Sequence, residues 1–437
     1  MTEQNQFGQN QEYDAYITCK YQSKIKDGRL EIGDWLYGDQ DVTNLKFIEK
    51  LNISTLILFI DKQISLKLRS NTIKELSMKK STRMEAFNSV LYLKVDDFEL
   101  ENLEVLDLQC NNMSNDQLQN IAKFKKLHTL NVSFNNVDLT HIHIVTSLTK
   151  LSMRYCALSN IDQITSLVNL EDLDLSANLV IDIISLFQIQ SLTKLNISDC
   201  QLKYIEGVKF PTNLEVLNLS SNQLQIIDSI GLLVNLKELN ISNNKNLDIT
   251  PLKSLSCLIK LFLNNCGLKS LSALKTLTNL QYLDLSSNDN IDIIELQYLT
   301  NLIYLDLKCC ELVSICVLRP LVNLESLDIE FNKILNVDNH FNEMKQLQAL
   351  KIQGNLISNF KQLEKHQNFN KLNRSDKQSF SISYQPSQTI FNVSDQGVPS
   401  KEELCYANKL RKIESPNIYC GVRANFDFNK CLCNNCA

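Results

Sequence analysis

Glycine, proline and histidine are scarce in this chain of 437 residues, which contains 10, 6 and 5 of them. With so little glycine, the chain has no glycine-rich loop of the kind whose backbone cradles phosphate groups. The few histidines do not combine with serine, cysteine or acidic residues into a recognisable catalytic arrangement. We therefore expect no enzymatic activity, no cofactor and no metal site.

A basic surplus and long apolar runs are absent as well. The chain carries 44 basic and 49 acidic residues, a net charge of −5, whereas binding to nucleic acid is driven by positive charge. No stretch of 18 apolar residues occurs, so we expect no membrane-spanning helix. The first eleven residues have neither the basic start nor the apolar core of a secretory signal. These features together predict a cytoplasmic protein.

Cysteine is the exception among the rarer residue types, because the chain has 14 of them. Nine precede residue 317, and in a cytoplasmic protein we interpret them as reduced thiols. Four others, Cys420, Cys431, Cys433 and Cys436, crowd into the last 18 residues. Their spacing is not the paired CxxC form that is usual for zinc, so we expect an unstructured tail, with a zinc site or acylation and redox chemistry as alternatives.

Leucine dominates the sequence and recurs at a fixed interval. The pattern LxxLxLxxN, in which Cys sometimes replaces Asn, begins twelve times, and from residue 148 to residue 324 its period is 22 at every step. Its alternating start is typical of a strand with one buried face, which neighbouring strands must cover by stacking into a parallel sheet. After the ninth position the apolar spacing becomes three, which suits 3₁₀ turns. The repeats begin at residues 103, 127, 148, 170, 192, 214, 236, 258, 280, 302, 324 and 347.

The repeat resembles the 22-residue, short-helix class of leucine-rich repeats found in bacterial internalins and in the leucine-rich regulatory subunit of protein phosphatase 1. Residues 222–233 are similar to that consensus, and the chain as a whole, rich in Asn, Lys and Ile, resembles leucine-rich-repeat-only proteins of diplomonad protists. The resemblance implies an α/β solenoid, a horseshoe with a parallel concave β-sheet and short 3₁₀ or irregular convex segments. It also implies a non-enzymatic protein that binds other proteins. The residues with which the phosphatase subunit contacts its enzyme are not matched position for position.

The ninth position of every repeat is Asn or Cys, at the point where the backbone leaves the strand and needs hydrogen-bond partners. A buried Asn side chain can donate to and accept from neighbouring turns, and Cys fits the same space with a weaker donor. We predict a ladder of these side chains along the solenoid, and the partial alternation of Asn and Cys indicates an older unit of 44 residues. The ladder residues are Asn111, Asn135, Cys156, Asn178, Cys200, Asn222, Asn244, Cys266, Asn288, Cys310, Asn332 and Asn355.

The regular array is one part of a longer predicted organisation. Residues 1–12 are polar and predicted to be disordered, and residues 13–100 are predicted to form an N-terminal cap with degenerate repeats. The other predicted segments are the array at 101–358, a C-terminal cap turn at 359–372, a linker at 373–399, a short helix at 400–413 and a Cys-rich irregular tail at 414–437.

The binding face can be predicted from positions three, five and seven of each repeat, which point off the concave sheet, with position eight at its rim. Position five is mostly Asn or Asp and position seven mostly Ser, which favours a solvated strand face. Aromatic and Arg side chains are common energetic anchors of interfaces, and they cluster at two places. The N-terminal patch consists of Phe134, Arg154 and Tyr155. The C-terminal patch consists of Tyr282, Tyr304, Asp306, Lys308, Asp328, Glu330 and Phe331.

The function that we hypothesise from these features is a monomeric scaffold that binds a protein partner on its concave face. We favour the C-terminal patch as the site, because two adjacent tyrosines in one column make a stacked surface. The alternatives are a regulatory subunit of a protein phosphatase and a secreted or surface adhesin-like protein exported without a conventional signal.

Overall fold

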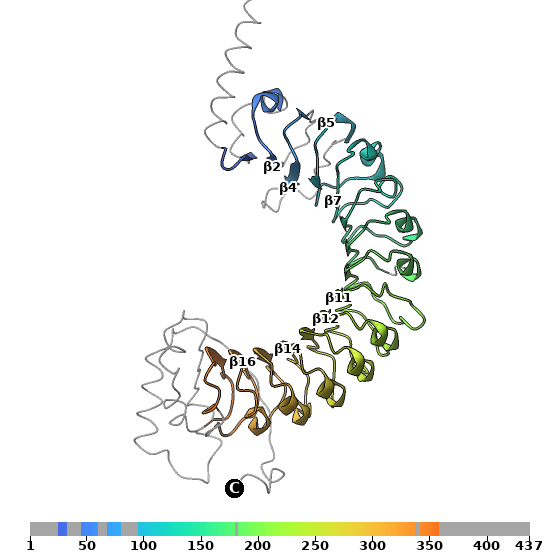
Figure 1. Ribbon diagram of the computed structural model, residues 1–437. Helices are drawn as coiled ribbons and strands as arrows, with labels where there is room; N and C mark the ends of the chain where they lie inside the picture. The colour runs from blue at the N-terminus through green and yellow to red at the C-terminus, as the bar shows by residue number, and fades with distance from the viewer. Residues whose placement is uncertain are drawn as a thin grey trace, which may run out of the picture.

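The chain folds into a curved solenoid with a continuous parallel sheet along its concave side (Figure 1). This computed structural model describes residues 25–32, 45–59, 68–79, 95–179, 182–337 and 341–357. The predictions for residues 1–12, 359–372, 373–399, 400–413 and 414–437, the four tail cysteines included, lie outside the described residues.

Fifteen strands form the concave sheet, each paired in parallel with the strand of the neighbouring repeat. In every regular repeat the strand spans positions three to five, and position four pairs with its equivalent, as Leu261 does with Leu283. The apolar side chains at positions one, four and six turn away from the concave surface and are buried. The strands, in sheet order, are β1 (Arg29–Ile32), β2 (Thr55–Phe59), β4 (Glu75–Lys79), β6 (Val105–Asp107), β7 (Thr129–Asn131), β8 (Lys150–Ser152), β9 (Asp172–Asp174), β10 (Lys194–Asn196), β11 (Val216–Asn218), β12 (Glu238–Asn240), β13 (Lys260–Phe262), β14 (Tyr282–Asp284), β15 (Tyr304–Asp306), β16 (Ser326–Asp328) and β17 (Ala349–Lys351).

The sheet begins before the first regular repeat. β1, β2 and β4 extend it at the N-terminal end, within the stretch for which we predicted degenerate repeats. A second parallel pair, β3 (Leu68–Ser70) with β5 (Phe98–Leu100), was not expected from the sequence. Phe98 in this pair is fully buried, so one large ring fills core space where the leucine pattern is irregular.

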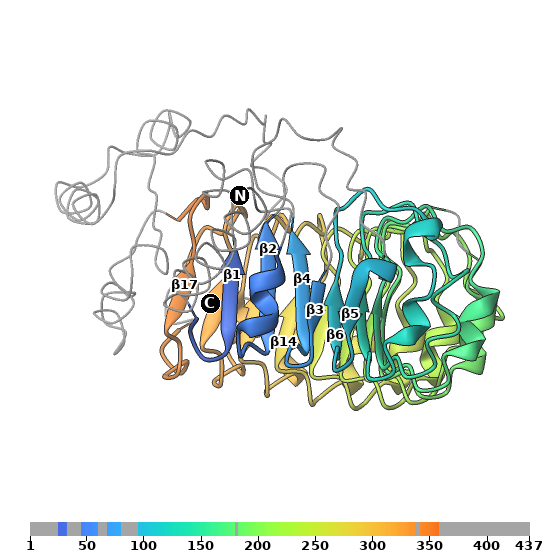
Figure 2. The ribbon, with the colours of Figure 1, turned by 90° about the horizontal axis from the view of Figure 1, so that it is seen from above.

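Short 3₁₀ helices line the convex side of the arc (Figures 1 and 2). Most span five residues and contribute a fully buried side chain to the core, as Leu274 does in η11. Because a 3₁₀ helix is thinner than an α-helix, the convex side is slim and the arc stays open. The predicted fold class is confirmed. The helices of the described residues are η2 (Leu45–Lys50), η4 (Val95–Asp97), η5 (Asn115–Leu118), η6 (Ile121–Lys123), η7 (Asp162–Ser166), η8 (Ile184–Gln188), η9 (Asp228–Leu232), η10 (Thr250–Ser254), η11 (Ser272–Thr276), η12 (Ile294–Tyr298) and η13 (Cys316–Leu318).

Position eight of every regular repeat has a left-handed backbone, which the sequence pattern did not reveal. The φ angle lies between 52° and 61° at the eleven residues other than glycine and is 70° at Gly354. Residues with a Cβ adopt this conformation at a cost of about 1 kcal/mol each, so the fold must hold the turn in place. Neighbouring turns do so through their backbones: the N–H of Asp199, for example, donates to the C=O of Ser220 (2.9 Å).

The asparagines at position nine join these turns through buried hydrogen bonds. Asn288 Oδ1 accepts from the backbone N–H groups of Cys266 (3.1 Å) and Leu268 (3.0 Å) in the preceding repeat. Its Nδ2 donates to the C=O groups of Leu263 (2.9 Å) and Leu285 (2.8 Å), one in each of two repeats. One amide therefore satisfies backbone groups on both sides of a repeat boundary. The same pattern recurs at Asn135, Asn178, Asn222 and Asn332.

Cysteine at position nine supplies only the donor half of this arrangement. Cys310 Sγ donates to the C=O groups of Leu285 (3.3 Å) and Lys308 (3.5 Å), and burial raises the pKa of the thiol to about 12, which keeps its proton in place. Because sulfur is a weak acceptor, the preceding turn is built differently. There the N–H of Asn290 donates to the backbone C=O of Cys310 (3.1 Å), and a similar bond reaches the C=O of Cys266. At Cys266 and Cys310, a Cys at position nine is therefore accompanied by a different turn in the preceding repeat.

A second row of asparagines joins the repeats just before position one. Their Nδ2 groups donate to backbone C=O groups of the preceding repeat over 2.7–3.1 Å, at exposed positions. We did not predict this row, although the recurring Asn-Leu pair at the start of the repeat was a signal for it. Its members are Asn102, Asn169, Asn213, Asn235, Asn279, Asn301 and Asn323.

Replacing Asn244 with Ala should lower the free energy of unfolding by about 1–3 kcal/mol, because buried backbone groups lose their partners. Among them are the N–H of Leu224 and the C=O of Leu219. The control is Asn235→Ala at the end of the preceding repeat, whose exposed bond to Thr212 should contribute less than about 0.5 kcal/mol. Urea unfolding followed by circular dichroism measures both variants. Equal losses would contradict the assignment of position nine as a buried hydrogen-bonding position.

Candidate functional site

Asparagine and aspartate at position five bind the backbone where each strand ends. In nine of the twelve regular repeats the side-chain Oδ1 accepts from the N–H two residues later, over 2.9–3.2 Å. Asn218, for instance, accepts from the N–H of Ser220 (3.0 Å). This row is therefore not the simply solvated face that we predicted, because its side chains are half-buried or buried and complete the hydrogen bonding of the strand ends.

Serine at position seven is buried as well. Ser176, Ser198, Ser220 and Ser242 are 0–8% exposed, so the expectation of a solvated column was wrong for them. Successive turns lie at the strand spacing of ~4.8 Å, and a short side chain at the start of a turn is covered by the turns on either side. Packing thus accounts for the small residues at this position.

Three residues at position five do not follow the capping rule: Ser152, Phe262 and Lys351. At the first of them, the N–H of Arg154 donates instead to Ser133 Oγ (3.1 Å). Phe262 has no acceptor, and the Lys351 side chain offers only donors. The last two lie on the strands that flank the C-terminal patch, so the structural rule is broken where aromatic and charged side chains gather.

Three aromatic rings, two of them stacked and one tilted, lie in contact across β13, β14 and β15. Tyr282 and Tyr304 are register partners at position three, and their rings stack 4.1 Å apart with an angle of 2° between their planes. Phe262 contacts Tyr282 from the preceding strand, with 5.0 Å between ring centroids. All three side chains are half-buried on the concave face. The two tyrosines were predicted from the sequence, whereas Phe262 was missed; its departure from Asn or Asp at position five was the available signal.

Three aspartates, Asp284, Asp306 and Asp328, occupy position five of consecutive strands beside these rings. The strand spacing of ~4.8 Å brings their like charges close together. Burial, followed by the charges of Asp328 and Asp284, raises the pKa of the Asp306 carboxyl to about 6. Burial and the charge of Asp306 raise the pKa of the Tyr304 hydroxyl far above its usual range, so this hydroxyl stays protonated and donates to Asp306 Oδ2 (3.4 Å).

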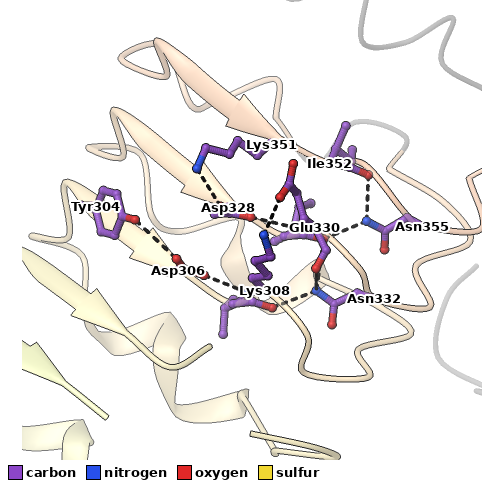
Figure 3. A network of polar contacts seen from close by, with 11 residues as sticks. Tyr304, Asp306, Lys308, Asp328, Glu330, Asn332, Lys351, Ile352 and Asn355 are labelled. Atoms are coloured by element: carbon purple, nitrogen blue, oxygen red, sulfur yellow. Dashed lines mark hydrogen bonds and ion pairs between the residues drawn. The ribbon is translucent and has the colours of Figure 1, made fainter. Parts of the chain in front are cut away.

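Two lysines neutralise the acidic side chains at the C-terminal end of the patch (Figure 3). Lys351 Nζ lies 3.0 Å from Asp328 Oδ2, and Lys308 Nζ lies 3.0 Å from Glu330 Oε2. The Lys308 ammonium also lies 5.0 Å from the centroid of the Phe331 ring. The structure therefore brings the seven predicted residues of the C-terminal patch together and adds Lys351, which the sequence reasoning did not include.

The N-terminal patch is smaller and lies at the rim of the sheet. The Phe134 and Tyr155 rings, both at position eight, stack with 5.6 Å between their centroids, and the Arg154 guanidinium lies 5.7 Å from the Phe134 ring. Phe134 is 39% and Tyr155 62% exposed, so these rings are more open to solvent than the half-buried tyrosines of the C-terminal patch. The two patches belong to distant repeats along the arc, around β7 and β8 and around β14 to β16.

Metal-ligand clusters, membrane-spanning helices and disulfides are absent from the described part of the chain. It contains no group of three or more His, Cys, Asp or Glu side chains arranged to hold a metal ion. None of the helices within it has the length and apolarity needed to cross a membrane. Its eight cysteines are all unpaired. The notable surface of the described residues is thus a set of aromatic and charged side chains on the strands of one sheet.

Comparison with known proteins assigns the repeat. A sequence profile described as "Leucine Rich repeats (2 copies)" matches residues 212–254, and one described as "Leucine Rich repeat" matches residues 99–122 and 276–292. A solved internalin from Listeria monocytogenes is similar, with 26% identity and a TM-score of 0.58 over 66% of this chain and 82% of that one. The chain is a leucine-rich-repeat protein.

A second solved structure shows the same fold. A leucine-rich-repeat protein from Leptospira interrogans has 23% identity and a TM-score of 0.58, and the match covers 81% of this chain and 92% of that one. No curated protein matches the chain by sequence. The predicted similarity to internalins is confirmed, and the leucine-rich-repeat assignment supports a scaffold for protein interactions.

Asp306→Asn should stabilise the leucine-rich-repeat array at neutral pH, because Asn keeps the cap on the Lys308 N–H and removes one of three crowded charges. The folded-state pKa of about 6 lies above the usual 3.8, so between about pH 4 and pH 6 the folded chain holds a proton that the unfolded chain has released. Wild-type stability should therefore fall as the pH rises through this window. At pH 7 the variant should be more stable by about 1–2 kcal/mol, after allowance for solvent screening, and near pH 4 it should show no gain.

Urea unfolding from about pH 4 to about pH 7.5 tests this expectation. The charged and titratable groups around Asp306 are Asp284, Asp328, Tyr282, Tyr304, Lys308, Cys309, Cys310 and Lys351. The matched control is Asp174→Asn, which changes the same cap in a repeat whose neighbours at position five, Ser152 and Asn196, are uncharged. A gain that does not depend on pH, or an equal gain in the control, would show that charge crowding is not the cause.

Proposed function

We propose that this leucine-rich-repeat protein is a non-enzymatic scaffold that binds a protein partner on its concave face, through the C-terminal patch together with Phe262 and Lys351. The observation that carries the proposal is the half-buried aromatic cluster of Phe262, Tyr282 and Tyr304 on the sheet surface. Aromatic side chains clustered near the centre of a surface are common energetic anchors of protein interfaces. The cluster is held by strands of a continuous sheet, so little conformational entropy is lost when a partner binds.

The fold itself does not require these rings. Position three of the other regular repeats is occupied by small, polar or charged residues or by Val, and position five is mostly Asn or Asp. The other repeats therefore fold without aromatic residues at these positions. An interface of ordinary size, about 1,600 Å² in total, fits easily on a sheet of this extent.

The proposed scaffold is a cytoplasmic monomer whose partner is neither a nucleic acid nor a membrane. The unpaired cysteines, four of them in ladder positions, favour a reducing compartment. The net charge of −5 gives no support for nucleic-acid binding. A phosphatase subunit would co-purify with phosphatase activity, and an exported adhesin would be found intact outside the cell, so each alternative has a direct test.

Replacing both Tyr282 and Tyr304 with Ala should abolish partner capture, because the two stacked anchors at the centre of the patch are removed together. Affinity capture from an extract of the native cells, read by mass spectrometry, measures the effect, and thermal unfolding checks that the array remains folded. The matched control replaces Phe134 and Tyr155, the other stacked aromatic pair, with Ala. It should leave capture unchanged.

Two outcomes would contradict the assignment of the site. Undiminished capture by the folded tyrosine variant would remove the C-terminal patch from the interface. Loss of capture in the Phe134 and Tyr155 variant alone would place the interface at the N-terminal patch.

A further inference from the structure

The large side chains at position three end at Tyr304. Its register partner on β16 is Ser326, which pairs in turn with Ala349 on β17. One face of the Tyr304 ring is covered by Tyr282, and the residues that follow on the other side are too small to cover it. Among the described residues, cationic groups lie over the rings of Phe124, Phe134, Tyr298 and Phe331, and none lies over Tyr304. The space above this face of the Tyr304 ring, on the side of Ser326, is called the step below.

The carboxylates beside this step carry more charge than their neighbours neutralise. Four of them, Asp284, Asp306, Asp328 and Glu330, face two ammonium groups, those of Lys308 and Lys351. Lys351 pairs with Asp328 and Lys308 with Glu330, which leaves two carboxylates without a cation in the described part of the chain. Asp284 and Asp306 accept there from backbone N–H and hydroxyl groups alone.

We propose that this step binds an arginine side chain of the protein partner, whose guanidinium lies on the open face of the Tyr304 ring and pairs with Asp306. The inference rests on the proposed function and specifies the chemistry of the partner. A planar guanidinium matches both parts of the site, because it stacks on an aromatic face and donates two parallel hydrogen bonds to a carboxylate. A lysine ammonium satisfies the charge but not the planar stacking geometry.

Other partner side chains fit this position less well. An apolar side chain would bury Asp306 without a counter-charge, which is unfavourable for an ionised carboxylate. An acidic side chain would add a further negative charge beside Asp284, Asp306 and Asp328. Charge complementarity therefore selects a basic segment, and the open ring face selects arginine within it.

A displayed library of random peptides, panned on the intact chain and counter-selected on the Tyr282→Ala, Tyr304→Ala variant, tests the inference. The selected peptides should share an arginine. Replacing that arginine with citrulline, its neutral isostere, should weaken binding roughly tenfold, since a charge-assisted pair is lost. Asp306→Asn should weaken binding of the arginine peptide by a similar factor and leave the citrulline peptide unaffected. Asp174→Asn, which alters the same kind of cap in β9, should change neither affinity.

The pH dependence of binding gives an independent readout. The pKa of Asp306 is raised to about 6, so this carboxyl is protonated at about pH 5. Its protonation should lower the affinity for the arginine peptide and leave the affinity for the citrulline peptide unchanged. Selected peptides that depend on the tyrosines but lack arginine, or bind Asp306→Asn equally well, would overturn this inference and leave the proposed function standing. If no selected peptide depends on the tyrosines, both the inference and the C-terminal patch as a peptide-binding surface are overturned.

Discussion

The geometry of the whole solenoid depends on the buried amide at position nine. Each turn leaves the sheet with backbone N–H and C=O groups that water does not reach, and the neighbouring repeat must supply their partners. Asn288 does so for two repeats at once, which fixes both the distance and the register between them. The 24-residue repeat that begins at residue 103 keeps these bonds to Asn135, because its extra residues come after the turn. The fixed place of the amide after each strand and the left-handed residue before it are therefore parts of one requirement.

The repeat pattern predicts which side chains are buried, but it does not predict which side chains form hydrogen bonds with the backbone. Leu258, Leu261 and Leu263 are buried as their spacing predicts, because burial depends on which face of a strand a side chain occupies. An Asn at position five, in contrast, has the same place in the pattern whether it is solvated or caps the backbone, and only the position of the N–H two residues later decides. The left-handed turn was hidden for a related reason, since residues such as Tyr155 and Phe331 do not favour that conformation on their own.

In the candidate site, too, some contacts could be predicted from the repeat and others could not. Residues at one position of successive repeats become neighbours in a parallel sheet, so the pairing of Tyr282 with Tyr304 followed from the repeat alone. The contact of Phe262 with Tyr282 runs diagonally, from position five of one strand to position three of the next, and a column-by-column reading misses it. Lys351 was missed for a similar reason, because its long side chain reaches back to Asp328 on the preceding strand.

Aspartate and asparagine cap the strand ends equally well in this protein. Asn196, Asn218 and Asn240 accept over 3.0–3.2 Å in three consecutive repeats, and Asp284, Asp306 and Asp328 accept over 2.9–3.1 Å in another three. Folding needs only the acceptor, so the charges of the second set are not explained by the fold, and their mutual repulsion opposes it. The strand ends are thus capped by neutral Asn in the middle repeats and by charged Asp beside the aromatic rings. A local loss of stability of this kind is expected where side chains serve contact with another molecule, and it would couple the stability of the array to the charge of the proposed partner.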